Sequence, residues 1–410
     1  MSTPQKDFIH ESQERGFIHQ ATDLDNLHEK IRSGSITGYI GFDASAPSLH
    51  VGNLVSLMWL RLLEKTGNKA IALLGGATTE VGDPSFRSTD RPFLETNTIA
   101  NYMETIAPSV QKVVPDVTIL NNATWLKNIH YMAFLRDYGR HFSVNRMLSF
   151  DSVQLRLERE QSLSFLEFNY MILQAYDFVH LAREHDCILQ MGGSDQWGNI
   201  VNGVELARRL GLKAIYGLTS PLITTAQGTK MGKTAQGAVW LNADMRTPFD
   251  YWQFWRNTHD ADVVKFLKLF TELPIDEIHR LEKLQGSEIN QAKIILANEA
   301  TAIIHGRGVL SDIQKAVDQV FSNEKGSLDG LPQYHLTQEN FPITIEELFV
   351  QSGLTSSKGA TRRLVEGKGI KMNDHVVTDG SKELNVADFP LKLSVGKKNH
   401  MQVCIRPEKV

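Results

Sequence analysis

The chain has 410 residues, of which 41% are hydrophobic and 22% are charged, and its formal net charge is −4 at neutral pH. This length allows two to four domains with an ample core, and the lack of internal repeats or low-complexity tracts excludes a repeat array. Cys187 and Cys404 stand far apart in the sequence, and neither belongs to a pair with the spacing of metal ligands. This argues against a zinc site or a disulfide framework.

The first residues give no sign of a targeting or membrane segment. Met1 to Gln20 carry mixed charges and no apolar run of the length that a signal peptide or a membrane span needs. No Arg-rich, acid-poor leader stands before them. We therefore expect a cytoplasmic protein without membrane attachment, although a mitochondrial location stays open.

Short apolar segments alternate with helical stretches through the first half of the chain. The predicted strands are Ile36 to Phe42, Lys69 to Leu74, Val117 to Leu120 and Cys187 to Met191. This alternation predicts an α/β fold with a Rossmann-like parallel sheet wrapped by helices. In such a sheet the functional site lies at the strand ends, where the loops converge.

Two short motifs beside these elements suit the binding of a polyphosphate. His50-Val51-Gly52-Asn53 stands at the mouth of a helix after the first predicted strand, where backbone N–H groups and an imidazole can face a phosphate. Lys230-Met231-Gly232-Lys233-Thr234 places two ammonium groups and a hydroxyl on a loop, which suits a mobile clamp. Separately, such motifs are typical of helix capping and of solvated surface. Together they predict two halves of one ATP site.

A polar face interrupts the apolar helix that we predict from Phe165 to Ala182. Tyr170, Gln174 and Asp177 stand at positions i, i+4 and i+7, so their polar ends share a face that should be buried. A buried polar group without a partner costs about 1–3 kcal/mol, and a charged one costs more. Two interpretations remain at this point: a polar cluster satisfied within the core, or the binding site of a polar ligand.

In this order, the two motifs resemble the HIGH and KMSKS signatures of class I aminoacyl-tRNA synthetases. Asn53 replaces the second histidine of the first signature, and Gly232 replaces a serine of the second. An asparagine still offers a hydrogen-bond donor and Thr234 keeps a hydroxyl, so contact with phosphate is retained.

Further stretches narrow the resemblance to the bacterial tyrosyl-tRNA synthetases, which the chain follows from about residue 35 to 240. These stretches are Tyr39 to Asp43, Gly75 to Thr78 with Gly82 to Ser85, Glu167 to Asp177, and Gln190 to Asn199. The resemblance implies a tyrosine–tRNA ligase: the tyrosine carboxylate attacks the α-phosphate of ATP to give tyrosyl-adenylate and pyrophosphate, and tyrosine then moves to the 3′ end of tRNA(Tyr). The protein positions the reactants and stabilises charge without a nucleophile of its own. ATP would arrive with Mg²⁺ on its phosphates, with no protein-held metal and no tightly bound cofactor.

The resemblance also implies roles for individual residues. Those implied for tyrosine are Tyr39 and Asp177 at its hydroxyl, Asp83, Tyr170 and Gln174 at its ammonium group, and Gln190 in the same pocket. Those implied for ATP and the adenylate are Gly41, Asp43, His50, Gly52, Asn53, Gly193, Asp195, Gln196 and Lys233. The negative charge on the departing pyrophosphate would be stabilised by Ser45, His50, Lys230, Lys233 and Thr234. Arg87 and Arg91 stand near family positions that also reach the phosphates, and the alternative is that they are solvated at the surface. A site that hydrogen-bonds the hydroxyl rejects phenylalanine by roughly 10⁵ without editing, a figure for which this family is itself the standard example.

Four segments follow from the resemblance and from composition. A catalytic domain is expected over 1–245, with an insertion at about 90–190 whose family counterpart forms a homodimer interface through helices such as Met132 to Met147. A helical anticodon-side domain is expected over 246–324, and the Pro- and Gly-rich stretch 325–342 suits a linker. Residues 343–410 resemble an S4-type RNA-binding module of α+β type.

This last segment is more basic than the rest. From Ile343 onward eleven Lys and Arg stand against eight Asp and Glu, a net charge of +3, so the preceding residues carry −7. Lys358, Arg362 and Arg363 recur at helical spacing and Lys368 follows in a turn. We expect these side chains to contact tRNA phosphates, so that tRNA affinity falls with salt; the alternative is a solvated basic face.

Two alternatives to the ligase remain. A tryptophan-activating relative would share the fold and both signatures, but Tyr39 with Asp177 argues against it, because an indole offers one N–H donor and no acceptor. The other is an RNA-binding protein that keeps the fold and has lost catalysis. The charged signature residues argue against it, since an inactive site has no physical need for those charges together.

Overall fold

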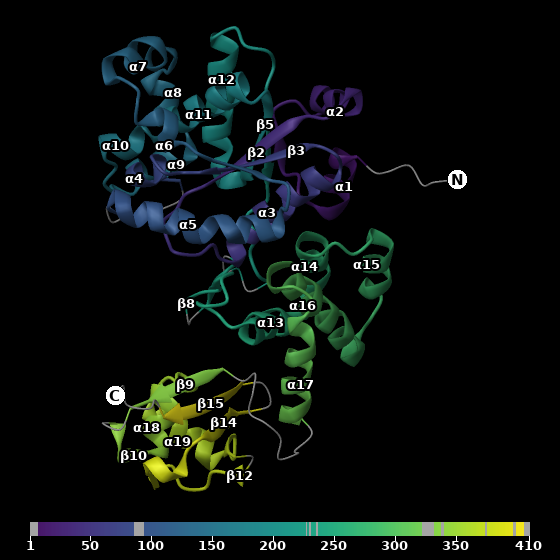
Figure 1. Cartoon of the computed structure of the whole chain (residues 1–410), viewed down its shortest axis with the longest axis vertical. Coiled ribbons are helices and arrows are strands. Elements are labelled where there is room, and N and C mark those ends of the chain that lie inside the picture. The colour runs from purple at the N-terminus through teal and green to yellow at the C-terminus, as the bar shows by residue number, and fades with distance from the viewer. Residues whose placement is uncertain are drawn as a thin grey trace. The chain divides into compact units, whose positions relative to one another are not determined.

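The computed structural model describes residues 7–85, 94–226, 228, 231–234, 237–321, 332–337, 340–373, 375–396 and 399–405. The chain divides into two compact units. The first consists of Met1–Arg246 and Phe254–Ile304, and the second of Thr247–Gln253 and His305–Val410. Figure 1 shows the helices and strands of both units.

A six-stranded sheet, ordered β1-β6-β5-β2-β3-β4, forms the centre of the first unit. Its strands are β1 (Gln20–Ala21), β2 (Thr37–Phe42), β3 (Lys69–Leu74), β4 (Thr118–Asn121), β5 (Cys187–Gly193) and β6 (Tyr216–Ser220). Neighbouring strands are parallel, except that the short edge strand β1 is antiparallel to β6. The predicted Rossmann-like sheet is therefore confirmed, and β1 and β6 add two strands to the four that were predicted.

The order of these strands places a crevice between β2 and β5. From β2 the chain builds outward through β3 and β4, and it then returns to the other side of β2 with β5 and β6. The loops that leave the carboxyl ends of β2 and β5 therefore run to opposite sides, which opens a space at this switch point. Residues Ala70 to Leu74 of β3 are all buried, because helices cover both faces of the sheet.

Helices pack against this sheet on both sides, with α3 on β2 and β3, and α11 and α12 on β5. The helices up to β6 are α1 (Phe8–Arg15), α2 (Leu24–Ser33), α3 (Val51–Lys65), α4 (Thr78–Val81), α5 (Thr96–Val113), α6 (Ala123–Leu126), α7 (Tyr131–Asp137), α8 (Val144–Leu148), α9 (Asp151–Glu158), α10 (Phe165–Phe168), α11 (Tyr170–Glu184) and α12 (Trp197–Arg209). The later part of the unit holds the hairpin β7 (Lys233–Thr234) and β8 (Gly237–Ala238), followed by α14 (Val263–Phe270), α15 (Ile275–Glu282) and α16 (Ile289–His305). Helix α13 (Pro248–Arg256) crosses the boundary of the two units.

Two predicted helical stretches are broken in the structure. The helix expected from Phe165 is split at Asn169 into α10 and α11, because the Asn169 side chain donates a hydrogen bond to the carbonyl of Phe165 at 2.7 Å and closes the first turn. The stretch from Met132 to Met147 consists of α7, a 3₁₀ turn that starts at Gly139, and α8. Glycine is a poor residue for a helix interior, which agrees with the break.

The second unit contains a five-stranded sheet, ordered β12-β11-β14-β15-β9, and a two-stranded sheet of β10 and β13. Its elements are α17 (Val309–Phe321), β9 (Gln333–Leu336), β10 (Ile343–Thr344), α18 (Ile345–Gln351), α19 (Lys358–Glu366), β11 (Ile370–Met372), β12 (His375–Val376), β13 (Glu383–Leu384), β14 (Leu391–Val395) and β15 (Asn399–Ile405). Leu348 and Phe349 of α18 pack with Leu393 and Val403 of the sheet in a separate buried core. The predicted α+β class of this segment is thus confirmed.

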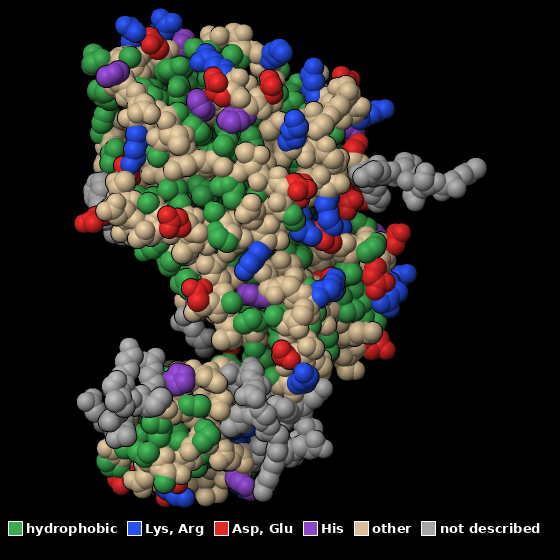
Figure 2. All heavy atoms as spheres, in the orientation of Figure 1, with side chains coloured by type: hydrophobic (Ala, Val, Ile, Leu, Met, Phe, Trp, Pro, Cys, Tyr) green, Lys and Arg blue, Asp and Glu red, His purple; other side chains and the backbone are tan. Residues whose placement is uncertain are grey.

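Charges of both signs share the surface. On the face drawn in Figure 2, Lys and Arg side chains lie among Asp and Glu side chains across the helices of the first unit. Within the described part of the chain, no helix has both the length and the apolar character needed to cross a membrane.

Candidate active site

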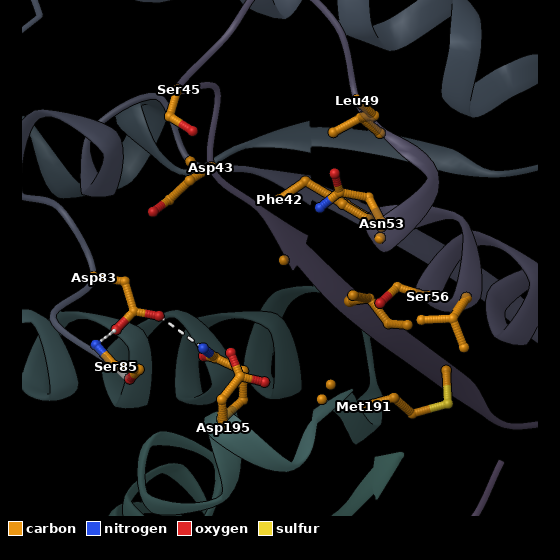
Figure 3. Close-up of a pocket in the computed structure, with 18 of the residues that line it drawn as sticks. Phe42, Asp43, Ser45, Leu49, Asn53, Ser56, Asp83, Ser85, Met191 and Asp195 are labelled. Atoms are coloured by element: carbon orange, nitrogen blue, oxygen red, sulfur yellow. Dashed lines mark hydrogen bonds between the residues drawn. The ribbon is translucent and has the colours of Figure 1, made fainter. Parts of the chain in front are cut away.

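A cavity of about 760 Å³ lies at the carboxyl ends of β2 and β5. Its lining includes every residue predicted for tyrosine or ATP whose side chain the structure describes: Tyr39, Gly41, Asp43, Ser45, His50, Gly52, Asn53, Asp83, Tyr170, Gln174, Asp177, Gln190, Gly193, Asp195 and Gln196. Figure 3 shows Asp43, Asp83 and Asp195 around one opening, with Asn53 and Ser56 on another wall. The switch point of the sheet therefore gathers residues that lie as far apart in the sequence as Tyr39 and Gln196.

Some predicted residues fall outside this description. Lys230, Arg87 and Arg91 lie outside the described residues. Lys233 and Thr234 are described only through their backbone, which forms strand β7 beside β8. The proposed contacts of their side chains with phosphate stay predictions.

Tyr39 and Asp177 lie at the buried end of the cavity, with side chains 1% and 3% exposed. The hydroxyl of Tyr39 has no hydrogen-bond partner among the described residues, and neither has Oε1 of Gln190. Burial raises the pKa of Tyr39 well above its usual value, and the charge of Asp177 raises it further. Leaving such groups unpaired costs about 1–3 kcal/mol each, so this end of the cavity is suited to a ligand that carries a polar group of its own.

Two N–H donors hold the carboxylate of Asp177. Trp125 donates through Nε1 at 2.7 Å, and Asn122 donates through Nδ2 at 2.9 Å. Burial raises the pKa of Asp177 to about 7, against the lowering effect of these hydrogen bonds. The indole of Trp125 also stacks on His180, with ring centroids 4.2 Å apart.

Asn122 and Trp125 were not predicted from the sequence. Asn122 follows β4 directly and Trp125 lies in α6 just after it, and the carboxyl end of a parallel strand is the position where side chains of a functional site gather. This position is the signal that could have identified them.

Asp83, Tyr170 and Gln174 lie together at another part of the cavity wall. Asp83 accepts hydrogen bonds from Nε2 of Gln196 at 2.7 Å and from the backbone N–H of Ser85 at 2.9 Å, as Figure 3 shows. The hydroxyl of Tyr170 donates to the carboxylate of Asp43 at 3.2 Å. The face that the sequence predicted to be polar thus points into the cavity. Its groups bond to residues that follow β2, β4 and β5 in the chain: Asp43, Asn122, Trp125, Gln196 and Asn199.

The first signature forms a reciprocal cap at the start of α3. Nδ1 of His50 accepts from the backbone N–H of Gly52 at 2.9 Å, and Oδ1 of Asn53 accepts from the backbone N–H of His50 at 3.1 Å. Since Nδ1 is the acceptor, a neutral His50 carries its proton on Nε2, which is a hydrogen-bond donor. The amide oxygen of Asn53 therefore helps to cap the start of α3 in this chain.

Backbone hydrogen bonds join the second signature to the first. Val51 donates to the carbonyl of Val239 at 2.9 Å, and Val239 in turn donates to the carbonyl of Gly232 at 3.0 Å. A Cβ on Gly52 would lie 3.0 Å from the carbonyl oxygen of Met231. The two signatures, far apart in the sequence, are therefore in direct contact beside the cavity.

The predicted basic face of the C-terminal segment is partly neutralised. Lys358 forms an ion pair with Glu347 at 2.8 Å, and Arg362 forms one with Glu346 at 3.0 Å. Arg363 is exposed and has no ion-pair partner among the described residues. Lys368 lies after α19 with a φ of +54°.

Comparisons with known proteins agree with this geometry. The family described as tRNA synthetases class I (W and Y) matches residues 32–322. The tyrosine–tRNA ligase of Ruegeria pomeroyi is 53% identical over 414 residues, which cover 98% of both chains. That of Rhodospirillum rubrum is 50% identical over 418 residues, which cover 99% of this chain and all of the other. A solved structure, the C-terminally truncated mitochondrial tyrosyl-tRNA synthetase of Aspergillus nidulans, is similar with a TM-score of 0.70 and 32% identity, over 77% of this chain and 94% of that one.

The chain therefore belongs to the class I tRNA synthetases that are specific for tryptophan or tyrosine. Its relatives at about half identity over nearly their full length give it the activity of a bacterial-type tyrosine–tRNA ligase, for which ATP is a substrate. A tryptophanyl-tRNA synthetase structure from Encephalitozoon cuniculi shares only the fold, at 13% identity and a TM-score of 0.54. Both alternatives that the sequence left open are thus disfavoured.

Proposed function

We propose that the cavity between β2 and β5 binds tyrosine with its hydroxyl against Tyr39 and Asp177. The observation that carries this proposal is the hydroxyl of Tyr39, which is buried without a partner beside a carboxylate that already accepts two N–H bonds. A phenol donates its proton to Asp177 and accepts one from Tyr39, so both protein groups become paired. Phenylalanine would leave the Tyr39 hydroxyl unpaired and offer Asp177 no further donor, and an indole N–H could serve only Asp177.

The same pose places the ammonium group of tyrosine among Asp83, Tyr170 and Gln174. Gln190 completes the lining near the phenol. With both polar ends fixed, the carboxylate of the substrate is directed to the open part of the cavity, where Asp195 and Gln196 orient it and hold the adenylate ribose. This arrangement favours attack on a phosphate that approaches from the first signature.

Activation then needs charge stabilisation and no protein nucleophile. The carboxylate oxygen forms a bond to the α-phosphorus of ATP, and the bond from that phosphorus to the pyrophosphate oxygen breaks. Nε2–H of His50 and the hydroxyl of Ser45 meet the developing negative charge from one side, and Lys230, Lys233 and Thr234 from the other. ATP enters as its Mg²⁺ complex, because Mg²⁺ binds mainly through substrate phosphates, and no tightly bound cofactor is part of this proposal.

Replacement of the Tyr39 hydroxyl tests this pose. We expect Tyr39→Phe to raise the KM for tyrosine about tenfold, since one hydrogen bond to the substrate is lost, and to leave the KM for ATP unchanged. Discrimination against phenylalanine should fall, because an orphaned hydroxyl no longer penalises the wrong substrate. An unchanged preference for tyrosine over phenylalanine in the variant would refute the pose.

We also propose a homodimer that forms through the apolar face of α7, α8, α9 and α10. These helices lie on one side of the first unit in Figure 1 and expose large apolar side chains: Tyr131, Met132, Val144, Leu148, Leu157, Phe165 and Leu166. Met132 on α7 and Phe165 on α10 are 74% and 69% exposed, and such a concentration of exposed apolar side chains is typical of an interaction surface. Phe165→Asp should shift the sedimentation of the protein from dimer to monomer, whereas Val386→Asp on the C-terminal unit should leave it unchanged.

For the remaining segments we propose the partition given by the resemblance. Residues 1–245 form the catalytic domain, 246–324 the anticodon-side domain, 325–342 a linker, and 343–410 an S4-like module for tRNA(Tyr) in the cytoplasm. Support comes from the separate core of Leu348, Phe349 and the C-terminal sheet. Expression of 343–410 alone tests the partition, because an independent module gives a cooperative unfolding transition and a dependent one does not.

A further inference from the structure

An ammonium group only donates hydrogen bonds, so each protein group around it must accept. The proposed ammonium site consists of a carboxylate, a hydroxyl and an amide, from Asp83, Tyr170 and Gln174. Only the carboxylate accepts whatever its orientation. The hydroxyl and the amide can face the substrate with either a donor or an acceptor, so their orientation must be fixed by other groups. The inference below rests on the proposed position of this ammonium group.

The hydroxyl of Tyr170 is fixed by Asp43. It donates its single proton to this carboxylate at 3.2–3.3 Å, so toward other groups the phenol oxygen of Tyr170 acts only as an acceptor.

The amides are fixed by a chain of hydrogen bonds that begins at Asp83. Nε2 of Gln196 donates to Oδ2 of Asp83 at 2.7 Å, because the carboxylate cannot donate. Oε1 of Gln196 therefore faces the opposite way, and it accepts from Nε2 of Gln174 at 3.2 Å. This direction leaves the oxygen of Gln174 as the group available to the substrate.

Asn199 closes this chain from behind the cavity. It lies on α12, is 6% exposed, and is absent from the lining of the cavity. Its Nδ2 donates to Oε1 of Gln174 at 3.0 Å and to Oε1 of Gln196 at 3.3 Å, one proton for each oxygen. An amide oxygen has two lone pairs, so Oε1 of Gln174 keeps one for an ammonium group.

We propose that Asn199 is a positioning residue that fixes Gln174 and Gln196 with their oxygens as acceptors, and so makes this part of the cavity selective for an ammonium group. Without the Asn199 donor, Gln174 is held by a single hydrogen bond. Its amide can then turn away for the loss of that one bond to Gln196, and it presents Nε2 to the substrate, where the donor of Gln174 meets the donors of the ammonium group.

The test compares three ligands that differ only in their charged groups, with the full-length protein and titration calorimetry. Tyrosine carries both groups, tyramine keeps the ammonium group alone, and 3-(4-hydroxyphenyl)propionate keeps the carboxylate alone. Asn199→Leu retains the approximate shape of the side chain and removes the donor. Asn202→Leu is the matched control, because Asn202 lies on the same helix, is 4% exposed, and does not line the cavity.

For Asn199→Leu we expect about tenfold weaker binding of tyrosine and of tyramine, and binding of 3-(4-hydroxyphenyl)propionate within twofold of the wild type. Asn202→Leu should bind all three ligands as the wild type does. Equal losses for all three ligands, or no loss for tyramine, would overturn the proposal in favour of a purely structural role. Asn199→Ala is the second variant if Asn199→Leu does not unfold cooperatively.

The outcome for the wild type separates this inference from the proposed function. If the wild type binds none of the three phenols, the pose itself is wrong and the role of Asn199 falls with it. If the wild type binds all three ligands and Asn199→Leu weakens tyrosine and tyramine no more than 3-(4-hydroxyphenyl)propionate, only the role of Asn199 is wrong.

Discussion

Gly232 lies so close to Gly52 that a Cβ on Gly232 would stand 2.7 Å from the backbone nitrogen of Gly52. The φ of Gly232 is +88°, a conformation that L side chains rarely adopt. The family signature has serine where this chain has Gly232, so the departure has a physical reason here. A glycine allows the second signature to lie directly on the first.

We therefore expect Gly232→Ser, which restores the serine of the signature, to impair the enzyme. The positive φ alone costs about 1–2 kcal/mol, and the contact with Gly52 adds to it, so pyrophosphate exchange should fall roughly tenfold or more with a raised KM for ATP. Gly228→Ser is the control, because Gly228 also has a positive φ, of +77°, but open space around it. Activity at or above the wild-type level in Gly232→Ser would show that the contact has no role.

Asp177 should make the stability of the protein depend on pH in a defined direction. Its pKa is raised from 3.8 to about 7 by burial, so between these values the folded state keeps a proton that the unfolded state has released. The stabilising contribution of this group is complete below pH 4 and is lost as the pH rises to about 7, by an amount on the order of 4 kcal/mol.

Asp177→Asn isolates this contribution, because asparagine does not titrate and all other groups are shared. The free energy of unfolding of the wild type relative to the variant should decline from pH 4 to pH 7 and be flat above it. Chemical denaturation at several pH values measures this difference. A difference that is independent of pH would mean that Asp177 is ionised throughout the range.

Trp125→Phe should weaken tyrosine binding through Asp177. The variant keeps an aromatic ring to stack on His180 and loses the N–H donor to the carboxylate, so the pKa of Asp177 rises further. We expect about a tenfold higher KM for tyrosine at pH 7, partly recovered at higher pH, and an unchanged KM for ATP. Trp59→Phe is the matched control, since Trp59 also loses an indole hydrogen bond, but its partner Ser12 does not line the cavity, whereas Asp177, the partner of Trp125, does. Equal effects of the two replacements would argue against this role.

Much of the fold was predictable from the sequence, because the apolar runs of the parallel strands are visible without any tertiary information. Several residues of the cavity were predictable for a related reason: Asp43, Gly193 and Asp195 lie at or just beyond strand ends, where a parallel sheet gathers its functional side chains. The polar face of α11 was visible from its spacing alone. Its interpretation as a ligand site required the resemblance to a family.

Other features depend on tertiary contacts and carry no local signal. Asn199 acts from behind the cavity, and nothing in its own segment shows that its amide bonds to two glutamines. The contact of Gly232 with Gly52 arises because Val51 and Val239 pair across the two signatures. The break at Asn169 reflects a side chain that bonds to the backbone, which periodicity does not detect.

Arg363 should contribute more to tRNA binding than its neighbour Arg362. Arg362 is engaged by Glu346 at 3.0 Å, whereas Arg363 is exposed without an ion-pair partner among the described residues. We expect Arg363→Gln to weaken tRNA binding several-fold and to lower the slope of log affinity against log salt by about one, with a smaller effect for Arg362→Gln. Filter binding over a series of salt concentrations measures both quantities. If neither slope changes, the C-terminal helix does not contact phosphate.

The pose of tyrosine against Tyr39 and Asp177 is tested most directly by ATP–pyrophosphate exchange with tyrosine, phenylalanine and tryptophan, in the wild type and in Asp177→Asn. We predict that tyrosine alone drives exchange in the wild type, and that the variant loses both rate and preference for the phenol. Exchange driven equally well by phenylalanine, or a variant that keeps the full preference for tyrosine, would contradict the assignment of the hydroxyl to Asp177.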